Sequence, residues 1–221
     1  MIVVTLVRLR MLTSDSEIDD RPRSMRDVAV QQRRTAMLYE PHVARLNAFA
    51  AKLRERGEVP NFDPLDGGEA ASALFLFEKP GPMTAEGGSR KRAGSGFISR
   101  NNDDPTAENI YNFMQRAGIP RKQTVIWNVV PWWNGTRKVT AQELREGTAC
   151  VKELITVLKS LRVVVMVGSQ AAKAKPFLKT TGLELFTSCH PSPVVRATNR
   201  NRWEAIPSEW KKVIPYLGIA T

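Results

Sequence analysis

Residues Ala73-Leu74-Phe75-Leu76-Phe77-Glu78 form a short segment that is apolar on both alternating faces, as in a strand buried on both sides. Three later segments have the same character: residues 124–129, 162–167 and 184–188. Continuous apolar runs of this length are typical of strands in a parallel sheet, because helices cover both faces of such a sheet. The four segments therefore favour a parallel sheet.

Amphipathic helices are predicted around and between these strands, from apolar residues at helical spacing and from end signals. Thr140 and Glu143, for example, form a capping box. Strands that alternate with helices are typical of crossover units, in which successive strands run parallel. The four predicted helices begin near Pro41, Asp104, Thr140 and Pro207 and end near Gly57, Gly118, Leu158 and Pro215.

The chain has 221 residues, 42% of them hydrophobic, which suits one α/β domain with a single core. Residues 13–26 carry several Asp and Arg side chains and look too hydrophilic to pack. We therefore expect residues 1–26 to form a mobile N-terminal segment, or an over-extended start with Met25 as the initiator. Residues 27–221 are expected to form the domain.

The charge of the chain is strongly positive, with 33 Lys and Arg against 22 Asp and Glu and a net charge of +11. Such a field attracts a polyanion, although a solvated basic surface without a nucleic-acid role has the same signature. Cys150 and Cys189 are too few for a disulfide framework or a four-thiolate cluster. We expect a cytoplasmic monomer with no membrane anchor, metal or cofactor.

A polar or turn motif follows each predicted strand. The first strand runs into residues 78–82, the second into Asn128 and residues 129–133, the third into Gly168-Ser169-Gln170 and the fourth into residues 189–193. Open parallel sheets bind ligands at the carboxyl ends of their strands. We therefore expect these four loops to meet at one edge of the sheet and to form a shared site.

The chain contains four motifs in this order: Glu78-Lys79-Pro80-Gly81-Pro82, Gly96-Phe97-Ile98-Ser99, Trp127-Asn128-Val129-Val130-Pro131-Trp132 and His190-Pro191-Ser192-Pro193. Together they resemble the uracil-DNA glycosylase superfamily over roughly residues 60–215. The resemblance implies a three-layer α/β/α sandwich around a central four-stranded parallel sheet. It also implies a monofunctional base-excision repair enzyme that flips uracil out of single- or double-stranded DNA and hydrolyses the N-glycosidic bond without a cofactor.

The resemblance implies catalytic roles for His190 and Glu78. Cleavage of the bond between C1′ and N1 leaves negative charge on uracil O2, which the neutral imidazole of His190 would stabilise. A carboxylate would orient the attacking water or stabilise the cationic sugar. The first motif is closest to the Glu-Ala-Pro-Gly type of an iron–sulfur branch, so the chain is expected to be a cluster-free relative with Glu78 in that role. Asp103 and Asp104 are the alternative carboxylates.

Base recognition is expected in the same loops. The carboxamide of Asn128 offers a donor and an acceptor to the edge of uracil. Phe97 is expected to stack on the flipped base, and Lys79, Pro80 and Gly81 to line its site. Lys79 and Gly81 stand where the best-known members have a catalytic Asp and a Tyr. Exclusion of thymine must then come from elsewhere or be incomplete.

DNA contacts are expected on the same rim. Val194 stands where relatives insert an apolar wedge into the base stack, and Ser169 and Ser192 are candidate phosphate ligands. A basic loop at residues 89–92 is a further candidate, with an ordinary solvated loop as its alternative. The alternative functions are a catalytically weak protein of the same fold that binds abasic or damaged DNA, and an unrelated α/β transferase or nucleotide-binding enzyme. Candidate phosphate-binding arginines are Arg196, Arg200 and Arg202.

Overall fold

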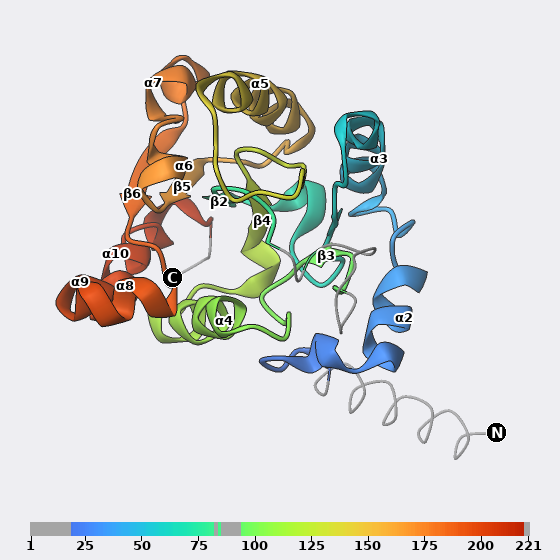
Figure 1. Cartoon of the computed structure of the whole chain (residues 1–221), viewed down its shortest axis with the longest axis horizontal. Helices are drawn as coiled ribbons and strands as arrows, with labels where there is room; N and C mark the ends of the chain where they lie inside the picture. The colour runs from blue at the N-terminus through green and yellow to red at the C-terminus, as the bar shows by residue number, and fades with distance from the viewer. Residues whose placement is uncertain (1–18, 82–83, 85–93, 219–221) are drawn as a thin grey trace.

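A computed structural model describes residues 19–81, 84 and 94–218 of the chain. Its centre is a four-stranded parallel sheet in the order β4-β2-β5-β6 (Figure 1). The predicted sheet is confirmed, and each strand agrees with its predicted range to within one residue at either end. The strands are β2 (Ala73–Phe77), β4 (Thr124–Asn128), β5 (Val163–Val167) and β6 (Glu184–Ser188).

Strand β2 pairs in parallel with both β4 and β5, and its last residue, Phe77, lies opposite Asn128. The chain passes from β2 to β4 on one side and then crosses to β5 on the other. The strand order therefore reverses at β2, which is where open sheets hold their ligands. All residues of β2, β4 and β5 are buried, whereas the edge strand β6 is partly exposed.

Helices cover both faces of the sheet, with α5 and α7 above it and α4 below it in the view of Figure 1. Phe49 of α3 packs against Trp127 on one face, at a centroid distance of 6.3 Å. On the other face Trp210 of α10 contacts Phe75 of β2 at 5.0 Å. No described helix is long and apolar enough to cross a membrane. These helices are α3 (Ala44–Leu53), α4 (Pro105–Ala117), α5 (Ala141–Val157), α7 (Lys175–Leu178) and α10 (Ile206–Lys211).

The end signals of the long helices are confirmed. Asp104 caps α4, which ends at Gly118, and Thr140 and Glu143 form the capping box of α5. The last predicted helix is shorter than expected, because α10 ends at Lys211 and Pro215 lies in a separate 3-10 turn. Short elements that lack a strong periodic pattern were not predicted: α2 (Val28–Ala36), β1 (Asn61–Phe62), β3 (Phe97–Ile98), α6 (Ser169–Ala172), α8 (Pro193–Thr198) and α9 (Arg200–Glu204).

Residues 19–26 pack against the domain, so the expectation that they are too hydrophilic to pack does not hold. Met25 is 2% exposed and forms a small second core with Val30 and Phe97. Asp19 accepts hydrogen bonds from Arg33 at 2.6 and 2.9 Å. The segment has few apolar residues, so its packing rests on hydrogen-bonded charges such as Asp19 and on the buried side chain of Met25. Residues 1–18 lie outside the described part of the chain.

A buried cluster of charges joins this N-terminal segment to the sheet. At its centre Arg121 donates hydrogen bonds to Asp63 at 2.6 Å and to Asp66 at 2.9 Å. Burial alone would raise the pKa of Asp63, but the charges of Arg121 and Arg34 outweigh it and lower that pKa to about 2. Asp63 is therefore ionised at neutral pH. The cluster comprises Asp20, Arg34, Asp63, Asp66, Arg100 and Arg121.

Replacing Arg121 by Gln leaves the buried carboxylates of Asp63 and Asp66 without their main partner. Loss of one member of a buried ion pair typically costs about 3–5 kcal/mol, so we expect R121Q to lower the free energy of unfolding by about that amount. Urea denaturation measures it. The matched control is R145Q on the exposed face of α5, which should change stability by less than about 0.5 kcal/mol. Equal unfolding free energies for the two variants would contradict the role of the cluster.

Candidate active site

A cleft of about 610 Å³ opens at the carboxyl edge of the sheet, and residues that follow all four strands line it. The structure thus brings the four strand ends together, as expected for a parallel sheet. The start of α4 and the loop before it form the opposite wall. The strand-end lining residues are Glu78, Lys79, Pro80, Gly81, Asn128, Gly168, Ser169, His190 and Ser192.

His190 is held by the turn between β6 and α8. Asn109 of α4 donates a hydrogen bond to the carbonyl of Pro191 at 2.8 Å. The ring of Phe77 lies perpendicular to the imidazole, at an interplanar angle of 89° and a centroid distance of 5.7 Å. Gly168 packs against the other side of the ring, where a Cβ atom would lie 3.2 Å from Cδ2 of His190. Because Gly168 also has a φ of 93°, this turn requires glycine.

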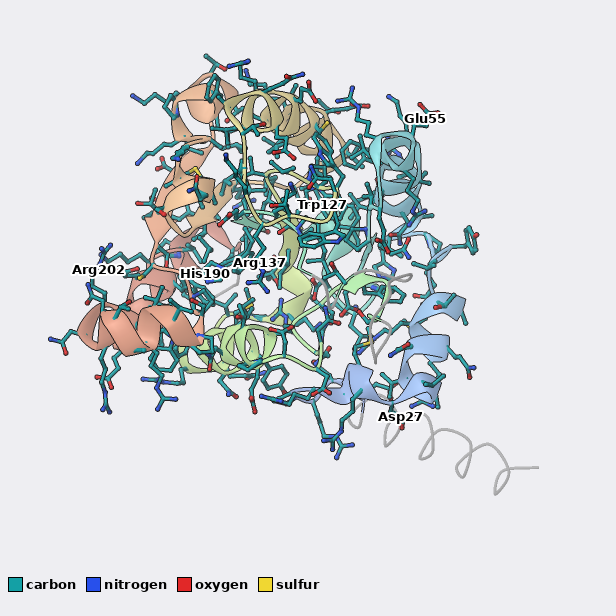
Figure 2. The ribbon with its side chains drawn as sticks, viewed as in Figure 1. Asp27, Glu55, Trp127, Arg137, His190 and Arg202 are labelled. Carbon is teal, nitrogen blue, oxygen red and sulfur yellow. The ribbon has the colours of Figure 1, made fainter. Side chains whose placement is uncertain are left out.

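The imidazole of His190 is neutral at pH 7. Burial, and then the positive charge of Arg137, lower its pKa from 6.5 to about 4. Figure 2 shows the two side chains close together between α6 and α4. No hydrogen bond reaches either ring nitrogen from another described residue, so a ligand can take both.

Among the described residues, two carboxylates line the cleft, those of Glu78 and Asp104. Asp104 is the N-cap of α4, and its Oδ1 atom already accepts hydrogen bonds from two backbone N–H groups at 2.9 and 3.0 Å. Asp103 lies outside the lining and forms an ion pair with Arg23 at 3.5 Å. Of the three candidate carboxylates, Glu78 is therefore the one that lines the cleft and whose side chain makes no hydrogen bond or ion pair with another described residue.

The backbone of Glu78 is fixed by the sheet, since its carbonyl accepts a hydrogen bond from the N–H of Val130 at 3.0 Å. Its side chain is half-buried, and burial raises the pKa of the carboxyl. The positive charges of Arg137, Lys173 and Lys79 act in the opposite direction and favour the carboxylate. The protonation of Glu78 thus depends on a balance between burial and cations that lie around the cleft.

Asn128 ends strand β4 at the floor of the cleft and is 4% exposed. The next residue, Val129, donates a backbone hydrogen bond to the carbonyl of Phe77 at 2.7 Å, which extends the pairing of β4 with β2. The carboxamide itself makes no hydrogen bond with another described residue. A buried amide costs free energy unless it is hydrogen-bonded, so this one is suited to a ligand with a donor and an acceptor.

Residues 67–214 match the family model of the Uracil DNA glycosylase superfamily, which covers more than half of the chain. This chain belongs to that superfamily. Its members are glycosylases that act on DNA. No curated protein matches the chain. The solution NMR structure of "a putative Uracil DNA glycosylase from Methanosarcina acetivorans" is 19% identical, covers 69% of this chain and 94% of its own, and has a TM-score of 0.46.

Two residues expected to bind the base do not present their functional groups to the cleft. Phe97 is 1% exposed and packs against Met25 and Val30, because side chains alternate along β3 and its neighbour Ile98 takes the cleft side. The ammonium of Lys79 is buried in an ion pair with Glu143 at 2.7 Å. The side chain of Phe77 lines the cleft, where a base could contact it.

The residues expected to bind DNA are divided between the cleft and a more distant surface. Val194 lies at the cleft and is 70% exposed, and Ser169 and Ser192 also line it. The three arginines are exposed and do not line the cleft, and Figure 2 shows Arg202 at the far end of this region from His190. Arg200 forms an ion pair with Glu204 at 2.8 Å. Residues 89–92 lie outside the described part of the chain.

Arg137 is the functional candidate that the sequence reasoning missed. It lines the cleft from the loop between β4 and α5. Its position after Asn128, in a strand-end loop of a basic chain, was the available signal.

Cys150 is buried in α5 and Cys189 lies beside His190. Among the described residues, no group of three or more His, Cys, Asp or Glu side chains could hold a metal ion.

The titration of His190 can be measured directly by NMR, because the chain contains two histidines and H190Q identifies the signal. We expect a midpoint near pH 4, since burial and Arg137 disfavour the imidazolium. The ring should therefore stay neutral as the pH falls from 7 through 6.5. A midpoint near 6.5 would show that the cleft does not desolvate the imidazole.

Proposed function

We propose that this member of the superfamily is a monofunctional glycosylase that flips uracil out of DNA and hydrolyses its N-glycosidic bond. The observation that carries the proposal is the convergence of three groups on one cleft: a neutral imidazole, a free carboxamide and a half-buried carboxyl. These groups belong to His190, Asn128 and Glu78. Each supplies one requirement of the reaction.

Asn128 recognises the uracil base, and His190 stabilises the base as the leaving group. The carboxamide of Asn128 donates to one polar atom of the uracil edge and accepts from another. As the bond between C1′ and N1 breaks, its electron pair passes to the base and negative charge develops on O2. An N–H of neutral His190 donates to that oxygen, and a donor aimed at developing charge is worth several kcal/mol in a site shielded from water.

The carboxylate of Glu78 orients the attacking water. The water oxygen forms a bond to C1′, and its proton passes to Glu78. Asp104 lines the same cleft, but one of its oxygens is engaged with the N-terminus of α4. For this reason we assign the water to Glu78. The net charge of +11 and exposed Val194 at the cleft support a DNA strand as the macromolecular substrate, held by a monomer.

A uracil-containing oligonucleotide treated with the protein and then with alkali tests the activity, because alkali cleaves the strand at an abasic site. We expect cleavage with wild type and a loss of about 10²–10³-fold in the excision rate with H190A, as for removal of one oxyanion donor. DNA binding by H190A should survive. No cleavage by stoichiometric wild-type protein that still binds the oligonucleotide would favour the alternative, a damaged- or abasic-DNA-binding protein.

The same assay distinguishes the three carboxylates. We expect E78Q to lose at least about 10²-fold in excision rate, because the amide cannot accept the proton of the water. D103N serves as the matched control, since Asp103 lies outside the cleft, and it should keep a rate close to that of wild type. If D104N lost activity and E78Q kept it, the assignment of the water to Glu78 would be wrong.

A further inference from the structure

Arg137 lies in a loop whose side chains point alternately to two sides. Arg137 lines the cleft with Glu78 and His190. Its neighbours Thr136 and Lys138 line a separate pocket of about 640 Å³. The loop therefore separates the two pockets, and the guanidinium of Arg137 lies on the side of the cleft.

The ion pair of Lys79 ties this loop to the sheet. Its ammonium lies 2.7 Å from Glu143 Oε1 and 2.7 Å from the amide oxygen of Asn134. Glu143 in turn accepts hydrogen bonds from the amide of Asn134 at 3.0 Å and from the N–H of Thr140 at 2.9 Å. The Lys79 side chain is 2% exposed. Because Lys79 directly follows Glu78, the same strand end holds the carboxyl and the loop that carries Arg137.

The proposed reaction requires both Glu78 and His190 to be deprotonated, and one cation can favour that state in both. Burial favours a protonated Glu78, which could not take a proton from water, and a positive charge favours its carboxylate. Burial favours a neutral His190, and a positive charge reinforces that state. Arg137 is exposed at the cleft, and its charge acts on both groups in the direction that hydrolysis requires.

Other charged groups also face these two residues. Lys173, which follows α6, and Lys79 act on Glu78. Asp104 lines the same cleft from the start of α4. Glu209 of α10 accepts a hydrogen bond from the backbone of Cys189, next to His190, at 3.4 Å. Lys79 is engaged in its ion pair, and Asp104 and Glu209 carry the sign that would favour an imidazolium. Among the described residues, Arg137 is the cation that acts on both groups.

We propose that Arg137 is a positioning residue that, from its place in the wall of the cleft, favours the carboxylate form of Glu78 and adds to the effect of burial on His190, and that the buried pair of Lys79 and Glu143 keeps its loop in place. The proposal rests on the proposed function for the roles of Glu78 and His190. The protonation of His190 can nevertheless be measured without any substrate. Failure of the proposed function and failure of this proposal are therefore distinguishable.

The test compares R137Q, R137K and the matched control K138Q, which removes the same charge one residue away on the side of the other pocket. We expect the NMR midpoint of His190 to rise from about 4 toward 6.5 in R137Q, to stay close to wild type in R137K and to be unchanged in K138Q. An unchanged midpoint in R137Q would overturn the proposal. An equal rise in K138Q would also overturn it, because net charge and not position would then be responsible.

Excision rates as a function of pH give the second readout. Without Arg137 the pKa values of Glu78 and His190 both rise, so the acid limb of the R137Q profile should move to higher pH, and R137K should restore it. A uniform loss of rate at all pH values, with no shift of the limb, would contradict the proposal. If wild type excises no uracil at any pH while the His190 titration still shifts in R137Q, the proposed function fails and the electrostatic role stands.

The contribution of Lys79 is tested with K79M, since Met keeps the length of the buried side chain and removes the charge. We expect the His190 midpoint to move in the same direction as in R137Q, because the loop loses its anchor. The double variant R137Q/K79M should show no further shift beyond R137Q. Additive shifts would mean that Lys79 acts by its own charge, and the anchoring role would be wrong. A circular dichroism spectrum like that of wild type verifies that K79M folds.

Discussion

Arg121 joins three parts of the chain through one guanidinium: the N-terminal segment at Asp20, the loop before β2 at Asp63 and Asp66, and the loop between β3 and α4 at Asn101. Arg100 extends this cluster to the first residue of β4, whose hydroxyl accepts its hydrogen bond. Buried charges are costly to desolvate and persist only when they are well partnered. The cluster therefore admits one arrangement of the loop between β3 and α4, and that loop forms a wall of the cleft.

Neighbouring residues in the strand-end motifs have contrasting environments. Glu78, Asn128 and His190 present polar atoms to the cleft that no other described residue takes up. The polar atoms of Lys79 and Asp103 are engaged in ion pairs outside it. Adjacent polar residues thus separate into groups that hold the structure and groups that are free for a ligand. This contrast, more than any one residue type, marks the cleft as a site.

The sheet and the strand-end groups were predictable because both follow from local rules. Apolar runs define the strands, and parallel strands bring Glu78, Asn128, Ser169 and His190 to one edge whatever the loops do. The direction of Phe97 was not predictable, since it depends on an N-terminal segment whose packing rests on partners distant in sequence. The place of Arg137 likewise depends on tertiary contacts of its loop, and no periodic pattern encodes them.

The pairing of Phe77 with Asn128 has a consequence for how the cleft can change. In a paired sheet one strand slides past its neighbour only in whole residues, each about 3.3 Å, and every such step turns the side chains to the opposite face. Reacting groups must be held to within about 0.5 Å. A change of strand register is therefore too large a step to adjust the positions of the reacting groups. Gradual adaptation to a different base must therefore come from the loops around the cleft, with the strands left in place.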